Sequence, residues 1–285
     1  MKNVQQVKKF GKLLNSFALT LTDHITYNGE WTVKGFIDLY KNIYLLSNDT
    51  KVLSKILELH LYPHLLDFAS INGYRIELSE HQNWYPDLTF IDKSNENIKY
   101  AVDLKTTYLL EDYPGFCNGF TLGSHGEYFI NRNSTKNIQY PYNYYSGHFC
   151  LGIIYTRVDI NEEFEEKWFS VERLEEIPSA IKNFTFFAVE KWRIASDKRG
   201  SGNTANIGSI NKIDDILTGN GTFAKAGEEI FDDYWTNYGK IIVTGKDGKQ
   251  KQLSSFDEYI TYRRLSPNIL NARAPKRKIA RGQNK

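Results

Sequence analysis

Apolar residues recur at helical spacing in two segments near the start of the chain. Residues 3–19 mix apolar positions with polar and lysine positions, and they predict an amphipathic helix. A second helix is predicted after Ser47 or Asp49, either of which can cap it. We expect Pro63 to break or kink this helix and Gly73 to end its continuation. Its apolar positions at helical spacing are Val52, Leu53, Ile56, Leu57 and Leu59.

Short runs rich in aromatic and β-branched residues follow, and they predict strands. The predicted strands occupy residues 74–78, 85–91, 97–104, 148–155 and 184–194, and helices are predicted at 228–238 and 254–264. Residues 109–132 and 196–210 read as long polar loops, which are usually functional in compact domains. The mixture predicts an α/β (α+β) fold, with a mixed β-sheet flanked by helices and one antiparallel hairpin.

The predicted strands at 85–91 and 97–104 are separated by a polar turn and form a hairpin centred on residue 95. That register places Asp87 opposite Asp103 on one face, with their Cβ atoms about 5 Å apart. Lys105 is two residues beyond Asp103 and therefore points to the same face. The residues expected on the other, buried face are Tyr100, Val102 and Leu104.

Two carboxylates directly across a strand pair destabilise it. A hard divalent cation removes that penalty, and Mg²⁺ prefers one or two carboxylates together with phosphate oxygens and water. Asp87, Asp103 and Lys105 therefore predict a metal-dependent phosphodiesterase site. The alternative is that both aspartates are solvated strand ends and that Lys105 is their ion-pair partner.

Composition limits the class of protein further. Hydrophobic residues make up 41% of the 285 residues and aromatic residues 14%, which indicates a packed globular core. The two cysteines, Cys117 and Cys150, form no C-x-x-C pair, which argues against a zinc site or a disulfide framework and suits a reducing cytoplasm. No apolar run approaches 18 residues, so we expect no membrane span.

Charge is distributed unevenly along the chain. The segment 268–285 holds six basic residues and no acidic one, so subtracting its +6 from the net charge of +2 leaves −4 for residues 1–267. A folded body of this charge would bind nucleic acid through a local cleft, with the tail as a flexible electrostatic anchor. An inert, solvated tail is the alternative.

The segment 200–209 is a second informative stretch. It lacks the lysine of a Walker phosphate loop, but its glycines allow close approach of a ligand and its amides can read the edge of adenine. Lys198 and Arg199, just upstream, are suitably placed for phosphates. An ordinary surface loop remains the alternative. The candidate DNA-binding residues are Gly200, Ser201, Gly202, Asn203, Thr204, Ala205 and Asn206, with Gln82 and Asn83 as a weaker pair.

Taken together, these stretches resemble the type II restriction endonucleases of the PD-(D/E)XK nuclease superfamily. The resemblance spans roughly residues 47 to 264, and its collinear set is more specific than the superfamily motif alone. The matching segments are 47–54, 85–87, 101–108, 120–123, 133–138, 155–158, 200–210 and 233–235.

The resemblance implies a role for individual residues. Asp87 and Asp103 would be Mg²⁺ ligands, Lys105 the catalytic lysine, and Glu58 an acidic residue near the metal. The loop 200–206 would read the DNA sequence. Gln82 and Asn83 would lie in a minor-groove loop, and Lys136 near the DNA backbone. The chain departs from the pattern at Ala205, where a second threonine is expected, and at Thr236, where an arginine is expected.

The resulting expectation is a Mg²⁺-dependent type II restriction endonuclease that acts on duplex DNA as a homodimer. The resemblance implies the site GATATC, cut bluntly to leave 5′-phosphate ends, and a cognate DNA methyltransferase in the same cell. The expected organisation is a helical dimerisation extension (1–46), an endonuclease domain (47–266) and a basic flexible tail (267–285). The alternatives are a DNA-binding protein that does not cut and a less specific repair or recombination nuclease.

Overall fold

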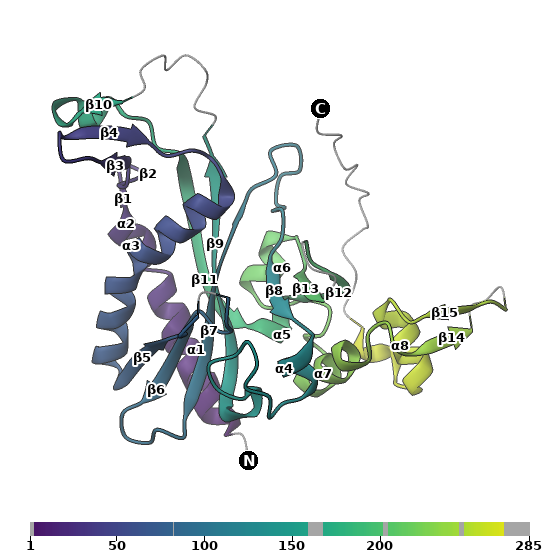
Figure 1. Cartoon of the computed structure of the whole chain (residues 1–285). Coiled ribbons are helices and arrows are strands. Elements are labelled where there is room, and N and C mark those ends of the chain that lie inside the picture. Colours follow the sequence, from purple (N-terminus) through teal and green to yellow (C-terminus); the bar gives the residue numbers. More distant parts are fainter. Residues whose placement is uncertain (1–2, 82, 159–167, 202–204, 245–247, 271–285) are drawn as a thin grey trace.

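The computed structural model describes residues 3–81, 83–158, 168–201, 205–244 and 248–270. Its centre is a seven-stranded sheet with helices packed against it (Figure 1), so the predicted mixed sheet with flanking helices is confirmed. The strand order across the sheet is β1 (Thr26–Tyr27), β2 (Glu30–Trp31), β11 (Ile181–Glu190), β9 (Tyr145–Arg157), β7 (Lys99–Tyr108), β6 (Leu88–Asp92) and β5 (Tyr74–Leu78).

The β6–β7 hairpin of this sheet has the predicted register. Leu88 lies opposite Val102 and Phe90 opposite Tyr100 in the antiparallel pair β6–β7. Strand β7 then pairs in parallel with β9, which in turn pairs antiparallel with β11. Both faces of β7 are covered, because the run from Tyr100 to Leu104 is buried without interruption. A strand buried on both faces belongs in the middle of a sheet, between two layers of structure.

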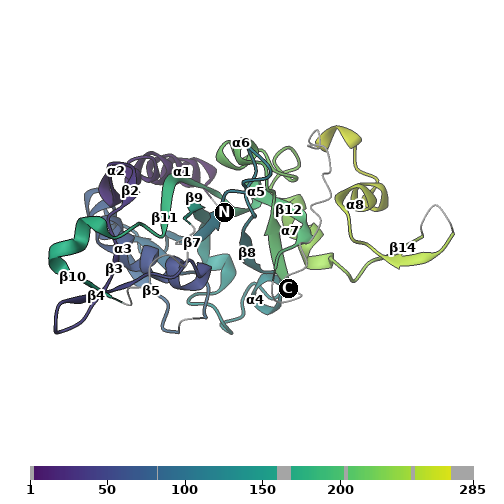
Figure 2. The ribbon, with the colours of Figure 1, turned by 90° about the horizontal axis from the view of Figure 1, so that it is seen from above.

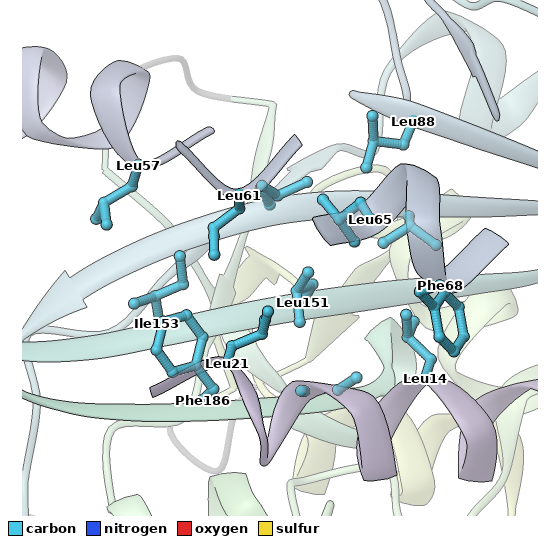
Figure 3. Packing of buried hydrophobic residues seen from close by; sticks show 14 of the residues in the cluster. Leu14, Leu21, Leu57, Leu61, Leu65, Phe68, Leu88, Leu151, Ile153 and Phe186 are labelled. Atoms are coloured by element: carbon cyan, nitrogen blue, oxygen red, sulfur yellow. The ribbon is translucent and has the colours of Figure 1, made fainter. Parts of the chain in front are cut away.

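One face of the sheet is covered by two long helices. Helix α1 (Val4–Ala18) lies against β9 and β11, and helix α3 (Thr50–Ile71) lies against β5 and β7; the short α2 (Leu21–Ile25) connects toward β1. Both long helices have side-chain caps, because Asn3 accepts from the first turn of α1 and Asp49 from the first turn of α3. Figure 3 shows Leu61 of α3, Leu14 of α1 and Leu151 and Phe186 of the sheet in one cluster of buried apolar side chains, with Phe68 of α3 beside Leu14.

The prediction that Pro63 breaks the helix was wrong, because α3 continues through this residue. Leu57, Leu61 and Leu65 are fully buried on both sides of the proline, and Pro63 itself lies on the exposed face. The packing of the buried face therefore outweighs the loss of one backbone hydrogen bond in this helix. Gly73 follows the helix with φ +78°, as expected for a glycine that ends a helix.

The opposite face of the sheet carries a layer of short elements. The two predicted polar loops meet here and pair into a three-stranded sheet of β12 (Ala195–Arg199), β13 (Asn206–Ser209) and β8 (Thr121–Ser124). The predicted strand 184–194 ends at Glu190 and turns into the short helix α5 (Lys191–Ile194). The other elements of this layer are α4 (Glu127–Ile130), η1 (Tyr142–Tyr144), α6 (Ile213–Leu217) and α7 (Glu228–Asn237).

The remaining elements lie at the ends of the molecule. Residues 26–45, expected to belong to a helical extension, form β1, β2, β3 (Gly35–Ile37) and β4 (Asn42–Leu45). Strand β4 lies between β3 and β10 (Phe169–Ser170) and pairs with both, and β10 is followed by η2 (Val171–Glu176). Helix α8 (Phe256–Arg263) and the hairpin β14 (Ile242–Thr244) and β15 (Gln250–Gln252) project from the far end (Figures 1 and 2), before η3 (Pro267–Ile269). None of the helices within the described ranges is long and apolar enough to cross a membrane.

Candidate active site

The two predicted aspartates are held together by the backbone of the β6–β7 hairpin. The backbone N–H of Asp87 donates a hydrogen bond to Asp103 Oδ1 over 3.2 Å. In return, the backbone N–H of Leu104 donates to Asp87 Oδ2 over 2.8 Å. Each carboxylate is thus oriented by an amide of the opposite strand, and the hairpin register brings the two acids to one face, as predicted.

Lys105 completes this cluster. Its Nζ lies 3.3 Å from Asp87 Oδ2 and 3.1 Å from Asp103 Oδ2. The three side chains differ in exposure, because Asp103 is 7% exposed, Lys105 23% and Asp87 31%. The reading of both aspartates as solvated strand ends is therefore wrong for Asp103. Asp87, immediately before β6, is the more open of the two carboxylates.

The electrostatics of the cluster follow from burial and from the closeness of two like charges. Burial raises the pKa of Asp103 above its usual value, and the neighbouring charge of Asp87 raises it further, although Lys105 and Lys191 oppose this. Burial acts in the other direction on Lys105, but Asp103 and Asp87 outweigh it and hold the pKa of the ammonium above its usual range. Lys105 is therefore a cation throughout the physiological pH range.

The carboxylates of Asp87 and Asp103 are suitable ligands for a hard divalent cation. Burial is the main cause of the raised pKa of Asp103 and the charge of Asp87 adds to it; a cation bound between the two acids would offset both effects. Within the described ranges, no group of three or more His, Cys, Asp or Glu side chains is arranged to hold a metal. The structure therefore does not bring Glu58 together with the two aspartates. Its carboxylate pairs instead with Lys55 on the same helix, at 2.5 Å.

Comparison with known proteins agrees with this geometry. Residues 27–264 match the family model described as restriction endonuclease EcoRV. The chain is also 39% identical to the type II restriction enzyme EcoRV of Escherichia coli over 234 aligned residues. The alignment covers 82% of this chain and 92% of that protein. This chain belongs to the EcoRV restriction endonuclease family. The family match begins inside the segment that we predicted as an N-terminal extension.

In this member of the EcoRV family, a groove of about 710 Å³ leads away from Lys105. The N-terminal turn of α3 forms part of its wall through Thr50 and Lys51, and Arg157 adds a further cation. Asp49 also lines the groove, but its carboxylate accepts from the backbone N–H groups of Lys51 and Val52 and so caps the helix. The two basic side chains are therefore the part of this wall that favours an anion. Ser54 Oγ, one turn later on α3, lies 2.5 Å from Thr106 Oγ1, which fixes the helix against β7.

The predicted recognition loop of this EcoRV relative reaches the same groove through Ser201. Ser201 Oγ lies 3.2 Å from Thr121 Oγ1 of β8, and the backbone oxygen of Ser201 accepts from Asn206 Nδ2 over 3.0 Å. Ala205 O accepts from the backbone N–H of His125, and Gly200 N–H donates to Asn206 O. Both ends of the loop are thus tied into the small sheet. Its central residues Gly202, Asn203 and Thr204 lie outside the described residues.

The other DNA-binding candidates lie at the surface. Gln82 falls outside the described residues, and Asn83 is exposed beside it. Lys136 pairs with Glu127 at 3.0 Å and is 67% exposed. The contacts of Gln82, Asn83 and Lys136 with DNA stay predictions.

Two positions near the aspartates escaped the sequence reasoning. Gly123 of β8 has φ +89°, and a Cβ at this position would lie 4.0 Å from Asp103 Oδ2. It was noted only as part of a matching segment. Lys191 is buried and interacts electrostatically with Asp103. The signal that could have revealed it is a lysine within an apolar and aromatic run predicted to be a buried strand.

Proposed function

We propose that this protein is a Mg²⁺-dependent type II restriction endonuclease that hydrolyses a phosphodiester bond in each strand of duplex DNA. The observation that carries the proposal is the placement of Asp87, Asp103 and Lys105 beside a groove that also contains Ser201 of the recognition loop. Family membership supports the same activity. A protein that only bound DNA would have no need for two carboxylates held against each other in spite of their mutual repulsion.

The chemistry of the site follows from these side chains. Asp87 and Asp103 would hold Mg²⁺, which when bound polarises the phosphate and lowers the pKa of a coordinated water. Lys105, protonated because of its two acidic neighbours, stabilises the negative charge that develops on the phosphate and orients the attacking water. The new bond forms between the water oxygen and phosphorus. The bond to the 3′-oxygen breaks, which leaves a 3′-hydroxyl and a 5′-phosphate.

The DNA backbone would follow the polar groove beside the site. Lys51, Lys105 and Arg157 line it and outnumber the acidic Asp49, so the groove has a net positive charge although the folded body as a whole has a net negative charge. Phosphates provide the largest share of affinity in most protein–DNA complexes. The groove, which Lys105 joins to the two aspartates, is our candidate for the local cleft that the charge distribution called for.

We further propose that the enzyme acts as a homodimer on the palindrome GATATC, cutting it bluntly at its centre. A two-fold axis shared by protein and site lets both strands be cut in the same way. A surface suited to self-association lies on β3 and β4 and the turn between them, where large apolar side chains are exposed. These are Phe36, Ile37, Leu39, Tyr40 and Tyr44. Light scattering after gel filtration tests the dimer directly.

Digestion of phage DNA with and without Mg²⁺ tests the activity. Discrete fragments that need Mg²⁺ are the expected result, and sequencing of their ends should give GATATC with blunt, 5′-phosphorylated termini. A smear would indicate a less specific nuclease, and binding without cutting would indicate a DNA-binding protein. Staggered ends or another consensus would reject the proposed site and leave the nuclease activity in place.

A cell that carries such an enzyme must protect its own DNA. We therefore propose that the enzyme acts in the cytoplasm beside a cognate DNA methyltransferase that modifies the same site. Genomic DNA from the source cell should resist digestion, whereas the same sequence amplified in vitro should be cut. Equal cutting of both would reject the methyltransferase.

A further inference from the structure

Lys191, the first residue of α5, is a buried lysine with no role in the chemistry described so far. Its side chain is 2% exposed, and its Nζ has no hydrogen-bond partner among the described residues. Burial of an ammonium without a hydrogen bond or an ion pair is strongly destabilising. A folded protein keeps such a group only where something else compensates for the burial.

Aromatic rings provide part of the compensation. Lys191 Nζ lies 4.8 Å from the ring centre of Tyr85, 5.2 Å from that of Tyr142 and 5.8 Å from that of Phe129. A cation close to several ring faces is stabilised by their negative electrostatic potential. The rings themselves are fixed, because Tyr85 Oη lies 2.9 Å from His148 Nδ1 and Tyr142 stacks on His148 at 3.8 Å.

The same cage places Lys191 behind the two aspartates. Tyr85 comes two residues before Asp87 in the chain. Across the sheet, Asp103 pairs with Cys150 and Cys150 with Val189, and Lys191 follows Val189 by two residues. Asp103 is the strongest electrostatic attraction on the ammonium, followed by Asp232, whereas Arg132 and Lys105 repel it.

The formal charges near the candidate active site therefore come to zero. Asp87 and Asp103 contribute two negative charges, and Lys105 and Lys191 contribute two positive ones. Burial, the largest effect, lowers the pKa of Lys191 to about 8, so the side chain is still mostly charged at neutral pH. Without Lys191 the cluster would carry one net negative charge, and a divalent cation would be attracted to it in the absence of DNA.

We propose that Lys191 is a positioning residue that weakens binding of a divalent cation to Asp87 and Asp103 until a DNA phosphate adds its negative charge. The inference rests on the proposed metal-dependent cleavage. Its consequence is that cation and DNA bind cooperatively, since each supplies the charge that the other needs. Lys105 cannot serve this purpose alone, because its single positive charge cancels only one of the two carboxylate charges.

The test is direct binding of Mn²⁺ to the whole protein without DNA, followed by electron paramagnetic resonance of the free ion. Lys191→Met removes the charge and keeps the length of the side chain, and Lys191→Gln is a second neutral variant. Both should bind Mn²⁺ about tenfold more tightly than the wild type, because one repulsive charge has gone. Lys251→Met, which removes an exposed lysine paired with Glu258 on α8, should leave Mn²⁺ binding unchanged.

The outcomes separate this inference from the proposed function. Asp103→Asn should lose most Mn²⁺ binding; if it does so while both Lys191 variants bind like the wild type, the metal site stands and the role of Lys191 is rejected. If Asp103→Asn retains full binding, the metal assignment fails and the inference fails with it. Failure of both neutral variants to fold would show that the ammonium serves the structure, and would also overturn the proposal.

Discussion

The two faces of the central sheet are built from different kinds of residue. The face under α1 and α3 is packed almost entirely with aliphatic and aromatic side chains, such as Phe10, Leu61 and Leu151. The opposite face has an aromatic cluster around Tyr85 and Phe129, and buried charged or polar groups lie among it. These groups include Asp103, Lys191, His148, Thr89 and Thr107.

Adjacent residues of one strand produce this difference. On β7, Tyr100, Val102 and Leu104 join the first core, whereas Ala101, Asp103 and Lys105 face the second. Because alternate residues of a strand point to opposite sides, a single strand can contribute both to stability and to chemistry. The first face thus supplies the free energy of folding that allows the second to keep two like charges close together.

The largest effect is expected from Asp103→Asn on the second face. Loss of a metal ligand should lower the rate of DNA cleavage by at least about a thousandfold. The midpoint of thermal unfolding should be no lower than in the wild type, because burial and Asp87 already disfavour the carboxylate charge. Initial rates on a plasmid substrate and calorimetry measure the two quantities. Retention of more than a few per cent of activity would contradict the assignment.

The opposite result is expected from Leu61→Ala on the first face. Leu61 is fully buried between α3 and the sheet, and its truncation should lower the free energy of unfolding by about 2–5 kcal/mol. Activity per folded molecule should stay within about twofold, since the side chain lies on the far side of the sheet. Urea denaturation and rate measurements at low temperature give both values. A large drop in activity at unchanged stability would break the comparison between the two faces.

A pH dependence sharpens the comparison further. The folded protein holds the proton of Lys191 less tightly than the unfolded chain, with a pKa of about 8 against 10.5. Below pH 8 Lys191 is protonated in both the folded and the unfolded state, and burying its charge costs the wild type about 3 kcal/mol of stability. Above pH 8 the folded state loses this proton first, so the cost falls. The stability advantage of Lys191→Met should therefore be constant below pH 8 and shrink between pH 8 and 10.5. Parallel urea titrations across this range test it, and a constant difference would contradict it.

The smallest effect is expected far from both faces. Residues 271–285 lie outside the described part of the chain, and residues 268–285 carry six basic residues without an acid. A protein ending at Pro267 should bind DNA more weakly at low salt. Its slope of log affinity against log salt should be shallower, by about 0.9 for each phosphate that the tail would otherwise neutralise. The cleaved sequence should not change. An identical salt slope would show that the tail does not bind DNA.

The sequence predicted the hairpin register and the Asp87–Asp103–Lys105 cluster because these depend on local alternation and one turn. It did not predict that residues 109–132 and 196–210 pair into one small sheet, since such pairing joins distant segments with no local periodicity. It also missed Lys191, because a lysine among apolar residues looks the same whether it is exposed at a strand end or buried in an aromatic cage. Pro63 was misjudged because tertiary packing decided the outcome there.

The small sheet also has a mechanical consequence. Asn206, at the end of the predicted recognition loop, pairs with Ser124 on β8, and the neighbouring residue on β8 is Gly123, which borders Asp103 Oδ2. If the loop reads DNA as predicted, a displacement of Asn206 would reach the carboxylate over one strand. Discrimination between DNA sequences would then be expressed in the rate of bond breaking, and not only in the strength of binding.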